Sequence, residues 1–299
     1  MLLVLPAQPG FALLKRVSST VHALDGELHV FCPFVQPRIP ATEVTLAGPV
    51  ELHDHGVTRA SATRFANRTA EALKKHDLDA DVEFGLFPTM TEGVLDAAER
   101  IDPDLLILPR ISRAGIFDRS FAVAYEQIWS RLGITTWIMH HGVVADQAIL
   151  GLIAMDSSID DRKSENERVA ATTTEFAKAL NVQAHLLCSE SKSKVVELAE
   201  AALSLQITKV SGDDEKEVVR DLSELARKFD IPNTRIHLDR GNEDDVIERI
   251  VDPLGVGLII THGRPRTTFG GLFAHHDVPD IGDAQCDLVV LGDDDEPPA

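Results

Sequence analysis

The sequence repeats itself at long range, and this duplication constrains the fold more than any single motif. His29 and His185 stand 156 positions apart in similar apolar runs, and Cys32 and Cys188 have the same separation. Other stretches keep nearly the same spacing, residues 104–107 with 257–260 at 153 positions and residues 137–139 with 288–290 at 151 positions. An offset that drifts so little along the whole chain indicates one structural unit encoded twice.

Each copy alternates short apolar runs with amphipathic segments. The predicted strands are 1–5, 28–32, 79–87, 105–108 and 136–139, then 148–155, 182–188, 234–239, 256–260 and 286–291. The predicted helices are 11–24, 57–75, 89–101, 120–131, 165–180, 213–228 and 244–251. This alternation predicts an α/β fold with two open, parallel five-stranded sheets, each covered by helices on both faces.

The boundary between the copies is expected near residues 142–147, which gives domains at 1–143 and 144–299. The last residues, 292–299, are acidic and contain two prolines, so we expect a disordered tail.

The second copy carries a candidate ligand-binding loop. Its apolar run 256–260 ends abruptly in Thr261, His262, Gly263, Arg264 and Pro265. In open α/β sheets, ligands bind outside the carboxyl ends of the strands, where such loops lie. The matching loop of the first copy, residues 109–113, has a different composition, so we expect the better-preserved site in the second copy.

These features together resemble the tandem, two-domain universal stress proteins. The similarity is carried by the element order of each half, by residues 156–158 (Asp-Ser-Ser) after a first strand, by residues 261–264 (Thr-His-Gly-Arg) after a fourth strand, and by the closing strand 286–291. The first half, in which Trp129 shortly precedes the strand at 136–139, is similar to the two-domain subgroup called E-type. The resemblance covers nearly all 299 residues.

The resemblance implies strand order 3-2-1-4-5 in each sheet. It also implies that the halves pair about a pseudo-twofold axis, either as a monomer with an internal pseudo-dimer or within a homodimer.

ATP-binding members of that family carry Gly-x2-Gly-x9-Gly-[Ser/Thr] after the fourth strand, because glycines let backbone amides approach the phosphates. Here Gly263 is present, but Ile260 stands three residues before it and Phe273 ten residues after it. Gly270 and the glycine after it could rebuild part of the loop. We therefore expect a degenerate motif that leaves ATP or another adenine nucleotide open in the second domain. ATP is not expected in the first domain, whose first strand ends without an Asp.

The resemblance also suggests individual roles. Asp156 could accept hydrogen bonds from an adenine amine or a ribose hydroxyl, although Asp followed by Ser is also a turn signal. Arg264 and Arg266 could bind a phosphate bidentately or form surface ion pairs. Gly241 follows the third strand of the second copy, where the family uses small residues near the nucleotide. The candidate ligand-binding residues are Asp156, Ser157, Gly241, Thr261, His262, Gly263, Arg264, Arg266 and His275.

The sequence shows no catalytic constellation and no convincing metal site. It lacks a Gly-x-Ser-x-Gly elbow, a Cys-x-x-Cys pair and an intact P-loop. Adjacent histidines such as His275 and His276 seldom converge on one metal ion within a loop. His29 and His185, inside strands, are expected to be hydrogen-bonded core residues rather than metal ligands.

Composition excludes several partners. A net charge of −19, from 48 acidic and 29 basic residues, argues against binding to nucleic acid or to an anionic membrane. Three cysteines in or beside apolar runs predict reduced, buried thiols and a cytoplasmic location. The N-terminus lacks the pattern of a signal peptide, and no run approaches the roughly 18 apolar residues of a membrane span.

The expected function is that of a non-enzymatic stress-response protein, which binds a nucleotide or another small ligand in its second domain and acts through a partner. One alternative is an interaction scaffold with vestigial pockets. Another is a weak metal-dependent hydrolase that uses Asp156, His262 and His275.

Overall fold

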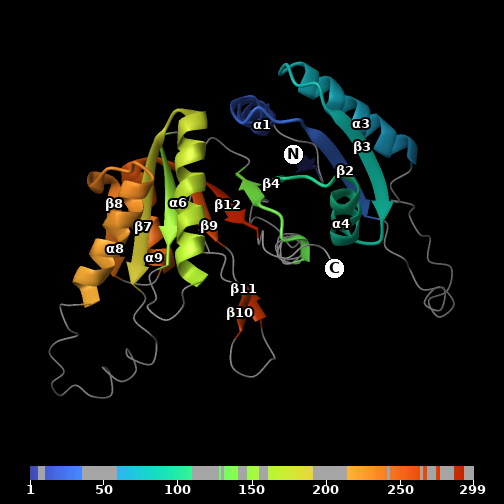
Figure 1. Cartoon of the computed structure of the whole chain (residues 1–299). Helices are drawn as coiled ribbons and strands as arrows, with labels where there is room; N and C mark the ends of the chain where they lie inside the picture. Colours follow the sequence, from blue (N-terminus) through green and yellow to red (C-terminus); the bar gives the residue numbers. More distant parts are fainter. Residues whose placement is uncertain are drawn as a thin grey trace. The chain divides into compact units, whose positions relative to one another are not determined.

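The computed structural model divides the chain into two compact units, residues 1–142 with 292–299 and residues 143–291. The residues that it describes are 1–5, 11–35, 59–109, 128, 131–140, 147–154, 161–190, 214–240, 243–262, 265–267, 274–276 and 286–292. Most of the helix predicted at 120–131 lies outside these ranges. Both units are α/β, and each is described by itself below (Figure 1).

The first unit contains five parallel strands in the order β3-β2-β1-β4-β5. Its elements are β1 (Leu2–Val4), α1 (Phe11–Ala23), β2 (His29–Val35), α3 (Arg59–Lys74), β3 (Asp81–Phe87), α4 (Met90–Ile101), β4 (Leu106–Pro109) and β5 (Thr136–Met139). The apolar face of α4 packs on the central strands, where Val94 and Ala97 meet Leu2, Phe31 and Leu106 in a buried cluster.

The second unit repeats this arrangement as β8-β7-β6-β9-β12, again with parallel pairing. Its elements are β6 (Ala148–Ile153), α6 (Asp161–Leu180), β7 (Gln183–Glu190), α8 (Asp214–Lys228), η1 (Asn233–Arg235), β8 (Ile236–Arg240), α9 (Glu243–Leu254), β9 (Val256–His262), β10 (Pro265–Thr267), β11 (Ala274–His276) and β12 (Asp287–Leu291). The predicted order 3-2-1-4-5 is therefore confirmed within each unit.

The duplication also shows in the way the helices end. Five helices, α1, α3, α4, α6 and α8, are followed within three residues by a residue in the left-handed conformation. These residues are Asp25, Asp77, Asp102, Asn181 and Asp230, with φ of 49°, 57°, 49°, 56° and 57°. At the end of α6, for example, Val182 donates to the carbonyl of Ala177 at 2.9 Å. Asp and Asn tolerate this conformation better than most residues, so each cap turns the chain cleanly toward the next strand.

The prediction that the second strand ends before Pro33 is wrong, because β2 continues to Val35. The carbonyl of Phe31 accepts the N–H of Leu5 at 2.9 Å, so the polar groups of Phe31 face β1. The nitrogen of Pro33, two residues later, faces the same side. Since β1 ends at Val4, the proline lies just beyond the last paired residue and removes at most one bond at the end of the ladder, to the carbonyl of Leu5.

The predicted end of the last helix of the second unit near Val251 is also wrong. The helix α9 continues to Leu254 and contains Pro253. A proline there removes only the bond to the carbonyl of Arg249. Both residues are exposed, so water can bind that carbonyl instead.

Two predictions from composition can be compared with the structure. All three cysteines are free and buried, as predicted. Among the helices in the described ranges, none combines the length and the apolar character that crossing a bilayer requires.

Candidate functional site

The strand order of the second unit reverses between β6 and β9. From β6 the chain builds β7 and β8 on one side, and then returns to add β9 and β12 on the other side. In open α/β sheets, the crevice at such a reversal, outside the carboxyl ends of the two strands, is the usual ligand-binding position. The carboxyl ends of β6 and β9 therefore define the candidate site.

These two strands end at the same level. Gly151 of β6 pairs with Ile260 of β9, and each strand continues for two further residues, to Ile153 and His262 respectively. The segment after β6, whose sequence contains Asp156, and the segment after β9 therefore leave the sheet at the same edge.

Thr261 and His262 are the last two residues of β9. Thr261 is buried, with 7% of its surface exposed, and lies opposite Val290 of β12. Its hydroxyl donates to the carbonyl of His262 at 3.4 Å. The ring of His262 is half-buried, and its Nδ1 is shielded from solvent. A buried strand thus holds both side chains at the edge.

Asn166 of α6 fastens the end of β6. Its Oδ1 accepts the N–H of Ala154 at 3.1 Å, and its Nδ2 donates to the carbonyl of Ala154 at 2.8 Å. The side chain is buried, with 8% exposed. The Asn166 side chain therefore binds the backbone of Ala154 as a neighbouring strand would. Ala154 lies where the chain leaves the sheet, two residues before Asp156. Sequence reasoning missed Asn166, because a polar residue in a helix gives no sign that it faces a strand end.

Beyond β9 the chain forms a small antiparallel ladder that the sequence did not predict. Arg266 of β10 stands directly opposite His275 of β11. Two of the predicted site residues thus share one ladder. Five others, Asp156, Ser157, Gly241, Gly263 and Arg264, lie outside the described residues, and their roles remain predictions from sequence.

A histidine pair lies inside the same unit, on neighbouring strands. The Nδ1 of His185 and the Nε2 of His237 are 2.9 Å apart, and the rings are stacked with centroids 5.3 Å apart. Burial, followed by the charges of His237 and Arg235, lowers the pKa of His185 to about 4. Burial also lowers the pKa of His237. The prediction of a hydrogen-bonded core residue is confirmed for His185, whereas His29, the first residue of β2, is only half-buried.

A metal site gains no support from the part of the chain that the structure describes. No group of three or more His, Cys, Asp or Glu side chains converges there in a way that could hold a metal ion. The side chain of His275, and Asp156 as a whole, fall outside that test.

No family model and no curated protein sequence matches the chain. Several solved structures, in contrast, have a similar fold. A protein from Pseudomonas aeruginosa UCBPP-PA14 described as a universal stress protein gives a TM-score of 0.63 at 12% identity, covering 97% of this chain and 92% of that one.

A protein of unknown function from Pseudomonas aeruginosa PAO1 also gives 0.63 at 12% identity, covering 98% of this chain and 92% of that one. A universal stress protein from Archaeoglobus fulgidus DSM 4304 gives 0.59 at 13% identity, covering 97% of this chain and 98% of that one. Over nearly its whole length, the chain therefore has the fold of the universal stress proteins.

Proposed function

We propose that this chain is a cytoplasmic stress-response protein of the universal stress class. It binds an adenine nucleotide, or another small ligand, at the carboxyl edge of its second unit, and it acts through a protein partner rather than by catalysis. The observation that carries the proposal is the reversal of strand order between β6 and β9, whose ends lie level.

The chemistry at this edge suits a nucleotide. Asp156 follows β6 and can accept hydrogen bonds from an adenine amine or a ribose hydroxyl. Thr261 and His262 end β9, and Gly263 and Arg264 follow them with a backbone amide and a guanidinium for phosphate. Asn166, which binds both polar groups of Ala154, holds the start of the segment that carries Asp156.

The incomplete glycine pattern should weaken phosphate binding without abolishing it. Each amide donor lost is worth about 1 kcal/mol net. Two lost donors would therefore lower the affinity by roughly tenfold to a hundredfold relative to an intact motif. Because the first copy has no Asp after its first strand, we expect one nucleotide per chain.

Two other functions make different predictions. A scaffold with vestigial pockets would bind no nucleotide, and its activity would depend only on its protein partner. A metal-dependent hydrolase using Asp156, His262 and His275 would retain a stoichiometric metal ion and turn over substrate.

Thermal unfolding with and without Mg-ATP tests the proposal. A ligand that binds only the folded state at ten times its Kd stabilises by about 1.4 kcal/mol, which raises the Tm measurably. We expect this shift in the unmodified protein and in Asp104→Ala, a control at an exposed carboxylate of the first unit. Asp156→Ala should lose it. No shift at several millimolar Mg-ATP, or an equal shift in Asp156→Ala, would overturn the proposal.

A further inference from the structure

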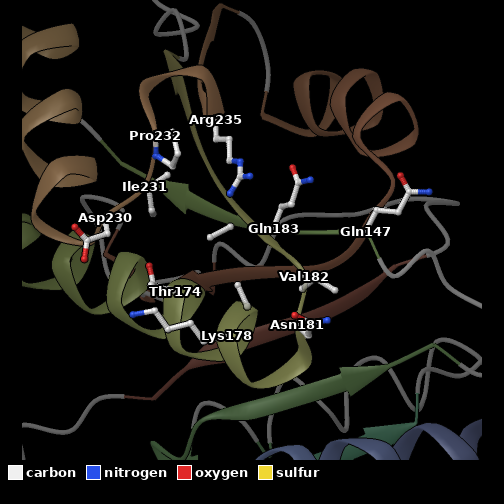
Figure 2. A pocket seen from close by; sticks show the side chains of 12 residues that line it. Gln147, Thr174, Lys178, Asn181, Val182, Gln183, Asp230, Ile231, Pro232 and Arg235 are labelled. Carbon is white, nitrogen blue, oxygen red and sulfur yellow. The ribbon is translucent and has the colours of Figure 1, made fainter.

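A cavity of about 750 Å³ lies at the opposite, amino edge of the second unit, where its strands begin. The end of α6, the turn η1 and the start of β7 line it, and it is open to solvent (Figure 2). Pockets that hold small molecules have volumes of about 300–1,000 Å³, so this cavity has the size of a ligand site. It is separate from the carboxyl edge and does not depend on nucleotide binding there.

The cavity combines an apolar wall with a few polar groups. Val182, Ala184 and Ile231 contribute to the wall. Figure 2 shows the guanidinium of Arg235 and the side-chain amide of Gln183 on the same side of the cavity. This combination, an apolar wall beside a small set of polar groups, is typical of small-molecule sites.

The backbone of Arg235 is held in place by the turn η1. Arg235 ends η1, and its backbone N–H donates to the carbonyl of Pro232 at 2.8 Å. The same loop is fixed at its start, where Ile231 donates to the carbonyl of Ala226 at 2.9 Å. Among the carboxylates that the structure describes, none forms an ion pair with Arg235. A half-buried guanidinium that has no carboxylate partner among the described residues is suited to an anionic ligand.

The first unit has a cavity of about 480 Å³ at the equivalent place, and this cavity lacks a counterpart of Arg235. There His29, the counterpart of His185, pairs with Asp81, whereas Arg235 stands opposite His185, one residue before the β7–β8 ladder begins. The lining of the smaller cavity also includes Asp25, Glu27, Asp77 and Asp79. The duplicated position thus has opposite charges in the two units, and of these two cavities only that of the second unit is lined by Arg or Lys.

We infer that the amino-edge cavity of the second unit binds a small monocarboxylate with a short apolar body. The guanidinium of Arg235 presents parallel N–H donors that match a planar carboxylate, and the amide of Gln183 can add another donor. Lys178, which also lines the cavity, adds positive potential. Asp230 lines it too, and the carboxyl ends of α6 and α8 point the same way, so a second negative charge on the ligand is disfavoured.

Calorimetric titration with isovalerate tests the site directly. Isoamyl alcohol has the same apolar body without the charge, and succinate and inorganic phosphate carry more charge. We expect saturable binding of isovalerate, and at least tenfold weaker binding of the other three. Arg235→Gln should weaken isovalerate binding at least tenfold, and Arg235→Asp, which copies the first unit, should abolish it. Arg68→Gln, the same change at an exposed position of the first unit, should have no effect.

A second readout does not depend on the heat of binding. Because the charge of Arg235 contributes to the low pKa of His185, a bound carboxylate should raise that pKa in an NMR titration. Circular dichroism would establish that each variant is folded. The inference is overturned if isovalerate does not bind at tens of millimolar, if it binds folded Arg235→Gln equally well, or if phosphate or succinate binds more tightly.

Discussion

Gly151 of β6 lies against Thr173 of α6 so closely that no larger residue fits. A Cβ at Gly151 would come within 2.5 Å of the Thr173 hydroxyl oxygen and 3.0 Å of Leu186. The hydroxyl cannot easily turn away, since it donates to the carbonyl of Val169 at 2.6 Å. The glycine therefore sets the distance between α6 and the sheet, and α6 in turn carries Asn166 to the end of β6.

We predict that Gly151→Ala lowers the free energy of unfolding of the second unit by about 1–3 kcal/mol, as overpacking does in other cores. Urea unfolding followed by circular dichroism measures this. Adding Thr173→Ala should restore part of the loss, because it removes the atom that the new methyl group meets. A Gly151→Ala protein as stable as the original would show that the helix can shift freely.

Asn166→Ala should cost about 1 kcal/mol, since it removes the partner of both the N–H and the carbonyl of Ala154 at a partly buried strand end, where water can replace part of the contact. Asn166→Asp keeps the acceptor but replaces the donor with a second oxygen facing that carbonyl, so it should cost at least as much. The same urea experiment measures both. If Asn166→Asp retains the original stability, the bidentate contact does not fasten β6.

The histidine pair predicts a specific pH dependence. The pKa of His185 is about 4 in the folded chain, against an ordinary value of 6.5. Between these values the unfolded chain binds a proton that the folded chain does not, so folding stability is fully present above pH 6.5 and falls as the pH drops toward 4. The loss is about 3 kcal/mol at most. Unfolding midpoints in urea at pH 7 and pH 4.5 should differ less in His185→Gln than in the original protein. An equal difference would contradict this account.

The buried thiols should be unreactive in the folded protein. Burial raises the pKa of Cys32 to about 12, so almost no thiolate exists at neutral pH. Cys188 and Cys286 are buried as well. Ellman's reagent should label the native protein only at the rate of unfolding, and urea should expose all three thiols. Rapid labelling of one native thiol would place a reactive cysteine at the surface.

Much of the fold could be predicted from local sequence, because its elements depend on short-range patterns. The helix predicted at 89–101 corresponds to α4 (Met90–Ile101), and its start is a local pattern, since the Thr89 hydroxyl accepts the N–H of Glu92 at 3.1 Å. The duplicated apolar runs likewise gave most of the strands. Pro33 was misread because its tolerance in β2 depends on where the neighbouring strand β1 ends, which no local pattern encodes.

The sites were harder to predict, because their residues converge from distant parts of the chain. Gln183 begins β7, and Arg235 directly precedes β8. Both line the same cavity because parallel strands begin at one edge of the sheet. Neither belongs to a motif. The charge reversal between Asp81 and Arg235 becomes visible only when the ladder registers align the two copies. A candidate site at the carboxyl edge could be proposed from sequence because a loop after a buried strand has a recognisable composition.

Native mass spectrometry tests the central claim, a small-ligand site at the carboxyl edge of the second unit, most directly. With Mg-ATP present, the chain should carry one nucleotide, Asp156→Ala should carry none, and Arg235→Gln should still carry one. A chain that stays free of nucleotide at millimolar Mg-ATP, or that retains a stoichiometric metal ion instead, would contradict the account.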